Sequence, residues 1–328
     1  MTLRLLQSRW IALTLALLTL GLIVACQRLP QTPIEPMAGD CTMVNQVAGQ
    51  TCVPTTIQRL VTLDGVSFEQ AIAAGLEPIA TVSADFQTQL PALLTDAQNI
   101  GKGGEPNLEA ILGARPDLIL GLAFHQPIYA QLTQIAPTLL FAFEHSGQWK
   151  EAFLTTGERL GQGAVAQSVL GAYQARLADF QAQMGDRLNT VQVSVIRLYP
   201  DGINLYLKDS FCGTVLQDAG LARPPSQDIG AAEAQQRFAN PIQSRISREV
   251  LAQADGDVIF IWTGENAAEG NQEAQKRLQD LQQDPLWKQL KGVQGGRVYE
   301  VPTYWIGSGP IAANAILDDL FKYLIGEK

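Results

Sequence analysis

Histidine and cysteine are scarce in this sequence of 328 residues, which contains only His125, His145 and four cysteines. Capture of a bare transition-metal ion calls for several His, Cys or carboxylate side chains that converge on one point. The shortage therefore disfavours proteins that bind free zinc or manganese. No two cysteines have the CxxC spacing, so nothing supports a structural zinc site, and we expect no metal that the protein ligates directly.

Motifs for nucleotide binding and for hydrolase catalysis are also missing. The stretch Gly161-Gln162-Gly163 lacks the third glycine of a dinucleotide fingerprint, because position 166 is Ala, and no Lys-Ser/Thr pair follows as in a P-loop. No Gly-x-Ser-x-Gly elbow occurs, and neither histidine has an evident nucleophilic partner. We therefore expect a protein that is not an enzyme and that has no cofactor.

Basic residues are outnumbered, with 23 Lys and Arg against 32 Asp and Glu, and no run of basic residues is longer than a pair. A protein that binds nucleic acid is expected to carry a basic groove or patch. The composition therefore excludes nucleic acid as an expected partner.

The first 25 residues predict an export signal. Arg4 and Arg9 precede 16 uncharged, mostly apolar residues, the layout of a secretory signal peptide. This run is shorter than the roughly 20 residues that a permanent membrane-spanning helix needs. It ends in Ile23-Val24-Ala25-Cys26, which resembles a bacterial lipobox. The resemblance implies that residues 1–25 are removed and that Cys26 carries a lipid anchor on the outer face of the cytoplasmic membrane. The alternative is an uncleaved signal anchor with Cys26 as an ordinary thiol.

The remaining cysteines agree with an exported chain. Cys41 and Cys52 are 11 residues apart across a polar stretch that contains Gly49, and we expect a local disulfide between them. Closing such a loop adds roughly 2–3 kcal/mol if the bond is unstrained. Cys212 then remains as a free, buried thiol. Prolines with polar neighbours predict that residues 26–54 form a lipidated tether rather than a domain.

From Arg59 onward, short apolar runs alternate with helical segments, which favours the α/β class with mainly parallel sheets. About 300 mature residues exceed what one core accommodates, so we expect two lobes. Residues 164–187 contain good helix formers and no proline, which predicts one rigid helix about 36 Å long. We predict an N-terminal lobe at 55–163 and a C-terminal lobe at 188–328, joined by this helix. The expected strands are 59–63, 79–82, 118–120, 138–141, 191–198, 258–262 and 298–301, and the other expected helices are 67–74, 107–114, 128–135, 213–219, 248–253, 273–283, 285–290 and 310–325.

An internal echo supports two related lobes. Asn107-Leu108-Glu109 is followed by Asp117, and Ser247-Arg248-Glu249 is followed by Asp257, with the Glu and the Asp eight residues apart in both cases. Each segment offers a residue to cap a helix, a Glu in its first turn and an Asp before a buried strand. The alternative is that lobes of this class share such a pattern by chance.

Several phrases spread over residues 55–324 carry a resemblance to a known family. The sequence resembles periplasmic binding proteins that serve ABC importers of iron–siderophore complexes, haem and cobalamin, and within them the ferric-siderophore branch that includes ferric citrate and hydroxamate binders. The resemblance implies a monomeric protein with two lobes, a rigid connecting helix and a ligand cleft between the lobes. The phrases are Gln58-Arg59-Leu60-Val61-Thr62-Leu63, Pro106-Asn107-Leu108-Glu109-Ala110-Ile111-Leu112, Arg115-Pro116-Asp117-Leu118-Ile119, Ile135-Ala136-Pro137-Thr138, Asp284-Pro285-Leu286-Trp287 and Gly296-Arg297-Val298-Tyr299.

The resemblance also implies how the protein meets its transporter. In such proteins one Glu on each lobe docks to the permease dimer, and Glu109 and Glu249 match those positions. Two exposed carboxylates on separate lobes would fix the orientation of the protein on the permease dimer through two electrostatic contacts. A Glu in a first helical turn also stabilises the helix dipole, which is the alternative role for both residues.

A siderophore delivers Fe³⁺ already wrapped in oxygen ligands, so the protein recognises the outside of the chelate, which is commonly anionic. Arginine forks and aromatic faces suit that surface. Ligands in open α/β sheets bind where strands end, which selects the candidates that follow. They are Arg197, Tyr199, Arg245, Trp262, Tyr304, Trp305, His125 and Lys102 in the loop Gly101-Lys102-Gly103-Gly104.

Each candidate has an alternative role. Trp262 and Trp305 would also suit a lobe core, Arg197 and Arg245 would suit surface ion pairs, and His125 would suit a satisfied loop. For the whole chain, the expected function is a lipoprotein that captures an iron–siderophore complex for an ABC importer. A haem or cobalamin binder of the same family is the alternative, and a secreted α/β enzyme or a structural lipoprotein without ligand are the rivals from other classes.

Overall fold

The structure is a computed structural model that describes residues 40–83, 90–93, 96–102, 104–264 and 268–326. The predicted signal peptide 1–25 and Cys26 lie outside the described residues. Residues Cys41–Lys328 form one compact unit, and the fold of this unit follows. Within the described part of the chain, no helix combines the length and the apolar character that a membrane crossing requires.

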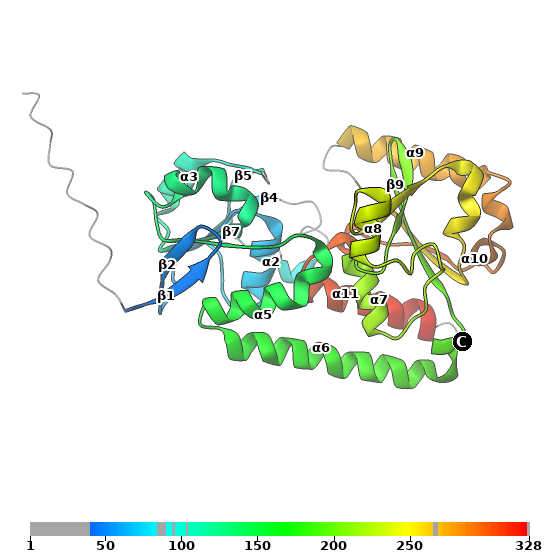
Figure 1. Ribbon diagram of the computed structural model, residues 1–328, viewed down its shortest axis with the longest axis horizontal. Helices are drawn as coiled ribbons and strands as arrows, with labels where there is room; N and C mark the ends of the chain where they lie inside the picture. Colours follow the sequence, from blue (N-terminus) through cyan, green and yellow to red (C-terminus); the bar gives the residue numbers. More distant parts are fainter. Residues whose placement is uncertain (1–39, 84–89, 94–95, 103, 265–267, 327–328) are drawn as a thin grey trace, which may run out of the picture. The chain divides into compact units, whose positions relative to one another are not determined.

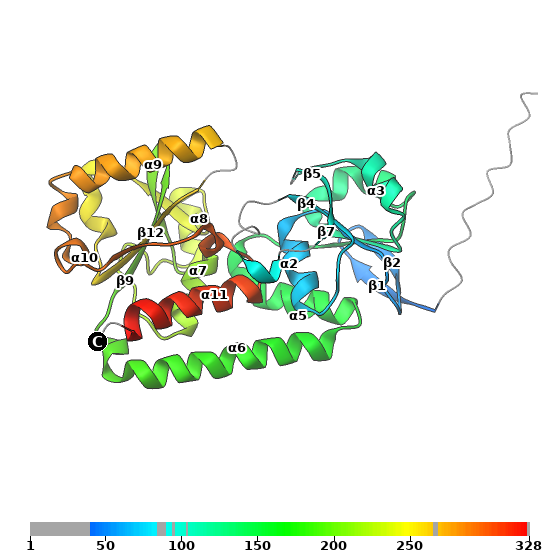
Figure 2. The same ribbon diagram turned by 180° about the vertical axis from the view of Figure 1, so that it is seen from behind.

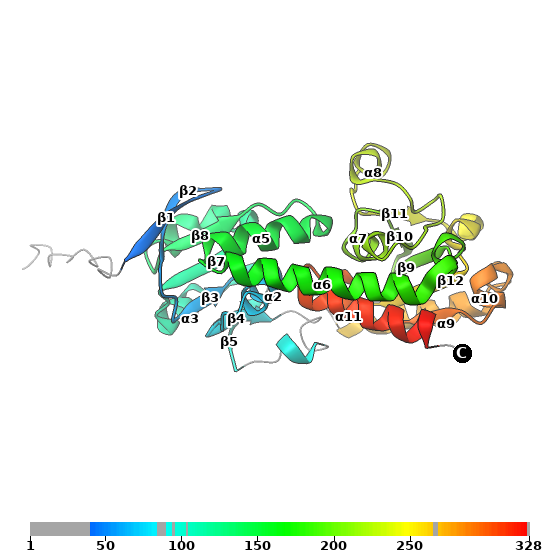
Figure 3. The same cartoon turned by 90° about the horizontal axis from the view of Figure 1, so that it is seen from below.

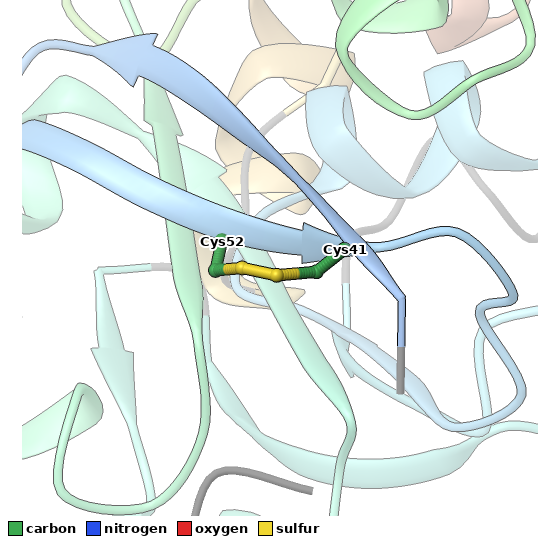
Figure 4. The surroundings of a disulfide bond; sticks show 2 residues. All are labelled: Cys41 and Cys52. Carbon is green, nitrogen blue, oxygen red and sulfur yellow. A yellow bond between two sulfur atoms is a disulfide. The ribbon is translucent and has the colours of Figure 1, made fainter. Parts of the chain in front are cut away.

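Residues that the sequence assigns to a tether form a β-hairpin instead. Strands β1 (Cys41–Gln46) and β2 (Gly49–Pro54) pair in antiparallel register, and the disulfide between Cys41 and Cys52 joins them (Figure 4). The Thr51 hydroxyl donates to the Thr138 carbonyl over 2.7 Å. The tether prediction is therefore wrong for residues 41–54, because the hairpin finds a partner in the edge strand of the first sheet, which sequence spacing cannot reveal.

The first sheet has the strand order β6-β5-β4-β3-β7-β8 and is parallel except for the short strand β6. Its buried strands read as nearly continuous apolar runs, as parallel strands covered on both faces do. Its strands are β3 (Leu60–Thr62), β4 (Ala80–Ser83), β5 (Gln98–Lys102), β6 (Glu105–Pro106), β7 (Leu118–Leu122) and β8 (Thr138–Phe141), and its helices are α2 (Gly65–Ala73), α3 (Leu108–Ala114) and α4 (Tyr129–Leu132).

The second sheet has the order β11-β10-β9-β12-β13. Strands β9, β12 and β13 are parallel to one another, whereas β10 and β11 are antiparallel to their neighbours. Strands β10 and β11 were not predicted. The strands are β9 (Val193–Tyr199), β10 (Gly202–Tyr206), β11 (Gln243–Ile246), β12 (Val258–Thr263) and β13 (Val298–Glu300), and the helices are α7 (Phe211–Asp218), α8 (Ala231–Phe238), α9 (Ala268–Gln283) and α10 (Lys291–Gln294). The predicted helices 248–253 and 285–290 are 3₁₀ turns at Arg248–Ala254 and Trp287–Gln289.

The predicted long helix is α6 (Gly163–Met184), which spans 22 residues, or about 33 Å at 1.5 Å per residue. Figures 1 and 3 show α6 running from beside α5 (Trp149–Arg159) to beside α11 (Pro310–Leu320), and Figure 2 shows the same pair of neighbours from behind. Two sheets with a long helix between them confirm the expected fold class. We call the first sheet with its helices the N-terminal lobe and the second sheet with its helices the C-terminal lobe.

One hydrophobic cluster extends across both lobes. A single cluster of buried side chains includes Phe68 of α2 and Phe153 of α5 together with Phe260 of β12 and Ile316 of α11. A polar contact also joins the lobes, since the indole Nε1 of Trp149 in α5 donates to the hydroxyl of Thr214 in α7 over 3.0 Å. A change in the angle between the lobes would therefore disrupt packed apolar contacts, which are costly to lose.

The internal echo corresponds to a shared structural detail. Asp117 precedes β7, and its Oδ2 accepts from the backbone N–H of Gln58 (2.7 Å) just before β3. Asp257 precedes β12, and its Oδ2 accepts from the N–H of Gln192 (2.9 Å) just before β9. In each lobe, the aspartate satisfies an otherwise open N–H group at the start of the neighbouring parallel strand.

Candidate ligand-binding site

Three of the predicted ligand residues lie in one row across the second sheet. Arg197 of β9 is opposite Asn204 of β10, Asn204 is opposite Arg245 of β11, and Trp262 of β12 is the partner of Arg197 on the other side. Residues that face each other across a sheet project from the same face. We call Arg197, Asn204 and Arg245 the cross-strand row, and Trp262 is its buried neighbour on β12. Arg197 and Trp262 lie near the carboxyl ends of parallel strands, where ligands bind in open α/β sheets.

A second line of polar side chains accompanies the cross-strand row. Gln243 of β11 lies two residues before Arg245, and Tyr199 lies two residues after Arg197, so both project from the same face. The Oε1 atom of Gln243 accepts from the amide of Asn204 over 2.7 Å and from the hydroxyl of Tyr199 over 3.3 Å. All of these side chains keep part of their surface in solvent, so the sheet presents a polar surface there.

Arg197 is held in a defined position. Its guanidinium donates from Nη1 to the Tyr206 hydroxyl over 3.1 Å and from Nη2 to the Gly264 carbonyl, and it lies 4.3 Å from the centroid of the Tyr199 ring. Such a fixed fork loses little conformational entropy when it binds an anion. Tyr206 is itself buried against Trp262, with ring centroids 4.9 Å apart, so the support under Arg197 is rigid.

Arg245 lies flat on the sheet beside Gly202. A Cβ atom at position 202 would fall 2.6 Å from Nε of Arg245, so a larger residue there would displace the guanidinium from this position. Arg245 donates from Nη1 to Oδ2 of Asp201 over 2.8 Å, and this hydrogen bond holds the pKa of Asp201 below its usual value. Both partners are exposed, and an exposed ion pair contributes little to stability. A ligand carboxylate can therefore replace Asp201 at small cost.

Two predicted aromatic residues are packed into the core. Trp262 and Trp305 are fully buried, and the Trp305 indole donates to Oδ2 of Asp319 over 2.8 Å. The Tyr304 hydroxyl donates to the same carboxylate oxygen over 2.9 Å, and burial raises the pKa of Asp319. Trp262 and Trp305 offer no surface to a ligand, so their alternative role in the core is the one we adopt. Tyr304 keeps part of its surface in solvent, but its hydroxyl is engaged.

In the N-terminal lobe, the His125 side chain is buried and its Nδ1 lies 3.7 Å from Oδ2 of Asp64. Asp64 also accepts from the N–H groups of Ser67 (2.7 Å) and Leu122 (3.0 Å). Burial raises the pKa of Asp64 and lowers that of His125. His125 therefore belongs to a buried cluster that ties α2 to the end of β7. Lys102 is exposed at the end of β5, so its ammonium group is accessible to a ligand.

The two predicted docking carboxylates are both exposed and lie in the first turn of their helices. Asn107 caps α3 by accepting from the N–H of Ala110 over 3.0 Å, and Glu109 follows in the first turn. Glu249 follows Ser247, whose hydrogen bond lowers the pKa of the Glu249 carboxyl. Exposure suits contact with a partner, whereas the first-turn position suits the helix dipole, and the geometry accommodates both roles.

Among the residues that the structure describes, no group of three or more His, Cys, Asp or Glu side chains is placed to hold a metal ion. Cys212 is free and buried, as expected. The cross-strand row consists of guanidinium and amide groups, which bind anions and oxygen acceptors rather than a bare cation. Any iron bound at this surface would therefore keep the oxygen ligands of its own chelator.

Residues 60–304 match the family model described as periplasmic binding protein. The chain belongs to this family. It is 31% identical over 283 residues to a probable siderophore-binding lipoprotein of Bacillus subtilis (strain 168), covering 84% of this chain and 85% of that protein. It is 28% identical to the achromobactin-binding periplasmic protein of Dickeya dadantii (strain 3937), covering 81% and 86%.

Solved structures agree on the architecture of this family member. Staphylococcus aureus SirA complexed with staphyloferrin B has a TM-score of 0.72 and 24% identity, and the match covers 86% of this chain and 98% of that one. At this level of identity the likeness concerns the fold. The predicted family is confirmed by these comparisons, and the named relatives are binding proteins, as expected for a chain that is not an enzyme.

Two polar residues of the site, Asn204 and Gln243, were not predicted. Both lie in short antiparallel strands whose sequences, GINLY and QSRI, are too brief to separate from loops. The alternation of apolar Ile203 and Leu205 around Asn204 was the available signal, because a period of two places the intervening residue on the opposite face.

Proposed function

We propose that this protein is the substrate-binding component of an ABC importer and that it captures an iron(III)–siderophore complex outside the cytoplasmic membrane. The observation that carries the proposal is the cross-strand row, in which Arg197 and Arg245 flank Asn204 on a partly exposed sheet face. Two guanidinium groups at the ends of strands suit the anionic outer surface of a ferric chelate. Relatives that are named as siderophore-binding and achromobactin-binding proteins support the same ligand class.

The haem and cobalamin alternative is less well supported. Two of the candidate ligand residues, Tyr304 and His125, could serve as axial ligands for haem, but the Tyr304 hydroxyl donates to Asp319 and His125 is buried against Asp64. Cobalamin would favour an aromatic cradle, whereas Trp262 and Trp305 are packed in the core. Neither haem binding nor cobalamin binding would account for the two arginines of the cross-strand row.

We further propose that Cys26 anchors the chain in the membrane, that the protein acts as a monomer, and that Glu109 and Glu249 register it on the permease. The lipobox-like segment before Cys26 supports the anchor. The exposure of both carboxylates and their matching places after a helix-capping residue in the two lobes support the docking role.

A binding titration tests the central proposal. The full-length chain, purified in mild detergent, is titrated with ferric citrate, a ferric tris-catecholate, a ferric hydroxamate, haem and cobalamin while tryptophan fluorescence is recorded. Trp262 is the strand neighbour of Arg197, so a ferric chelate at the row should quench its emission. We expect a dissociation constant below about 10 µM for at least one ferric chelate. Weaker binding of all ferric chelates, or tighter binding of haem or cobalamin, would refute the proposal.

A further inference from the structure

The outward face of α3 combines a carboxylate with an aliphatic side chain. Glu109 and Leu112 are three residues apart in this helix, so their side chains are neighbours on its surface. Both are exposed, and Leu112 keeps 58% of its surface in solvent. The same helix buries Ile111 in the core of the N-terminal lobe. Core packing therefore does not account for a leucine at position 112.

Gly113 adds a flat place to the same face of α3. It lies four residues after Glu109 and is exposed. A Cβ atom added at Gly113 would meet no described atom within 4 Å, and the backbone there does not have the positive φ that favours glycine. Glycine inside a helix is less favourable than alanine, so the fold gives no reason for it, whereas close approach of another chain does. We call Glu109, Leu112 and Gly113 the α3 patch.

The C-terminal lobe repeats the combination of a carboxylate with exposed aliphatic groups. Glu249 is followed by Val250, which is 40% exposed. Arg248, on the other side of Glu249, forms an ion pair with Asp284. Asp284 also accepts from the N–H of Leu286 over 2.7 Å, so Leu286, which is 39% exposed, lies beside this turn. We call Glu249, Val250 and Leu286 the Glu249 patch.

Exposed aliphatic side chains are concentrated at these two patches. Seven large hydrophobic side chains are exposed in the part of the chain that the structure describes, and three of them are Leu112, Val250 and Leu286. A single exposed hydrophobic residue needs no explanation. An exposed ion pair by itself contributes little to binding, however, and aliphatic groups around it supply affinity and exclude water when a partner covers them. The surroundings of the two carboxylates suit such a contact.

We infer that the α3 patch and the Glu249 patch are composite interaction surfaces for the permease, each of which accepts a basic side chain set among apolar groups. This inference rests on the proposed function and extends the docking sites beyond their carboxylates. The carboxylates set the orientation of the protein through charge pairs. The aliphatic side chains supply affinity, and Gly113 leaves room for the partner to approach α3 closely.

The first test uses a substitution that should not harm the fold. Gly113→Ala adds one methyl group to the α3 patch, and the melting temperature should stay the same or rise, because alanine favours the helix. Iron uptake should fall at least about threefold, because an added methyl group is poorly tolerated in a close contact. Gly171→Ala in α6 is the matched control, since Gly171 is also exposed in a helix with no described atom within 4 Å of an added Cβ. Full uptake with Gly113→Ala would overturn the inference for α3.

The second test shortens the aliphatic side chains. Leu112→Ala, and Val250→Ala combined with Leu286→Ala, should each reduce uptake by about tenfold, which is the order of the change in an equilibrium constant when one large aliphatic side chain is no longer buried. The affinity of the purified full-length chain for the ferric chelate should not change. Val165→Ala, at an exposed aliphatic residue of α6, is the matched control and should leave uptake unchanged.

Uptake is measured in cells whose own copy of the gene is deleted and replaced by each variant. Radioactive iron is supplied as ferric citrate, as a ferric tris-catecholate and as ferrioxamine, and the variants are compared with the chelate that the wild type takes up. If Glu109→Ala with Glu249→Ala stops uptake while the aliphatic variants retain it, the inference is overturned and docking by the carboxylates stands. Full uptake in the carboxylate variant would refute the docking proposal. No uptake of any of the three chelates by the wild type would refute the proposed function itself.

Discussion

Arg197 and Arg245 both lie opposite Asn204, one from each neighbouring strand, so the two guanidinium groups project from the same face of the second sheet. This relationship depends on the antiparallel strand β10 between them. If Asn204 were shifted by one residue, its side chain would point to the opposite face, among the apolar residues that pack on α9. The binding surface is therefore a property of strand register as much as of composition.

The two arginines should contribute separately to affinity. Arg197→Ala and Arg245→Ala are each expected to weaken the binding of an anionic ferric chelate by roughly tenfold or more, because a hydrogen bond to a charged group contributes about 1.5–3 kcal/mol. Arg197→Lys should recover only part of the loss, since lysine keeps the charge but not the fork. Fluorescence titration measures the effect. Arg237→Ala, at an exposed arginine paired with Glu233 on α8, is the control, and an equal loss in it would argue against a local role.

Asp201 competes with the ligand for Arg245. The Asp201→Asn substitution removes a negative charge beside the row and frees Arg245 from its ion pair, so we expect anionic chelates to bind a few-fold more tightly. The gain in affinity should be largest at low ionic strength, because salt weakens the interaction between exposed charges. The screening length is about 10 Å at 0.1 M salt. Titrations at two salt concentrations check this. Weaker binding at both would show that Asp201 positions Arg245 rather than competing for it.

Glu69 of α2 connects the lobes through a fully buried carboxylate. Its Oε1 accepts from the N–H of Ala312 in α11 over 2.8 Å, and a Cβ atom at Gly309 would fall 2.6 Å from its carboxyl carbon. Burial raises the pKa of Glu69 from 4.5 to about 7. The folded protein therefore holds this proton more tightly than the unfolded chain does, and the associated stability is present below pH 4.5 and is lost as the pH rises through 7.

The Glu69→Gln substitution isolates the pH-dependent contribution of Glu69 to stability. Glu69→Gln removes the ionisation, so the free energy of unfolding of the variant relative to wild type should increase between pH 5 and pH 8, by up to about 3 kcal/mol. Urea unfolding at several pH values measures the difference. Glu158→Gln on α5, at an exposed position, is the control and should show no such trend. A constant difference across this pH range would mean that Glu69 does not titrate there.

The hairpin disulfide should stabilise the chain. Replacing both Cys41 and Cys52 by serine is expected to lower the free energy of unfolding by roughly 2–3 kcal/mol, because the bond restricts the unfolded loop. The melting temperature of the wild type should fall on addition of reductant, and that of the double variant should not respond. A reductant effect that persists in the double variant would point to Cys212, the remaining cysteine among the described residues.

The docking proposal predicts a separation between transport and binding. Glu109→Ala combined with Glu249→Ala should abolish iron uptake in cells and leave the affinity for the ferric chelate unchanged, because both carboxylates are exposed in the first turns of their helices. Glu158→Ala together with Glu144→Ala removes the same charge from exposed positions elsewhere. Normal uptake in the Glu109 and Glu249 variant would contradict the docking role.

Local signals in the chain predicted most of the elements. The strand Thr138–Phe141 has the predicted bounds, and the helix after Asn107 begins where its capping side chain indicates. These elements depend on apolar runs and on helix-capping residues, and both signals come from residues close together in the sequence. The short strands β10 and β11 were missed because four or five residues carry too little pattern. The hairpin of residues 41–54 was read as a tether because its partner, β8, lies more than 80 residues away.

The sequence by itself predicted an export signal, and it determined the α/β class, the long helix, the scarcity of metal ligands and the presence of Arg197 and Arg245 near strand ends. Only the tertiary structure decided which of the candidate side chains share a face. Burial of Trp262 and Trp305 depends on helices that are remote in the chain, and His125 is buried against Asp64 at the start of α2. The grouping of Arg197 with Arg245 depends on pairing through Asn204. Composition and periodicity report what each segment prefers, whereas register and packing are set by contacts between segments, and those contacts exist only once the chain has folded.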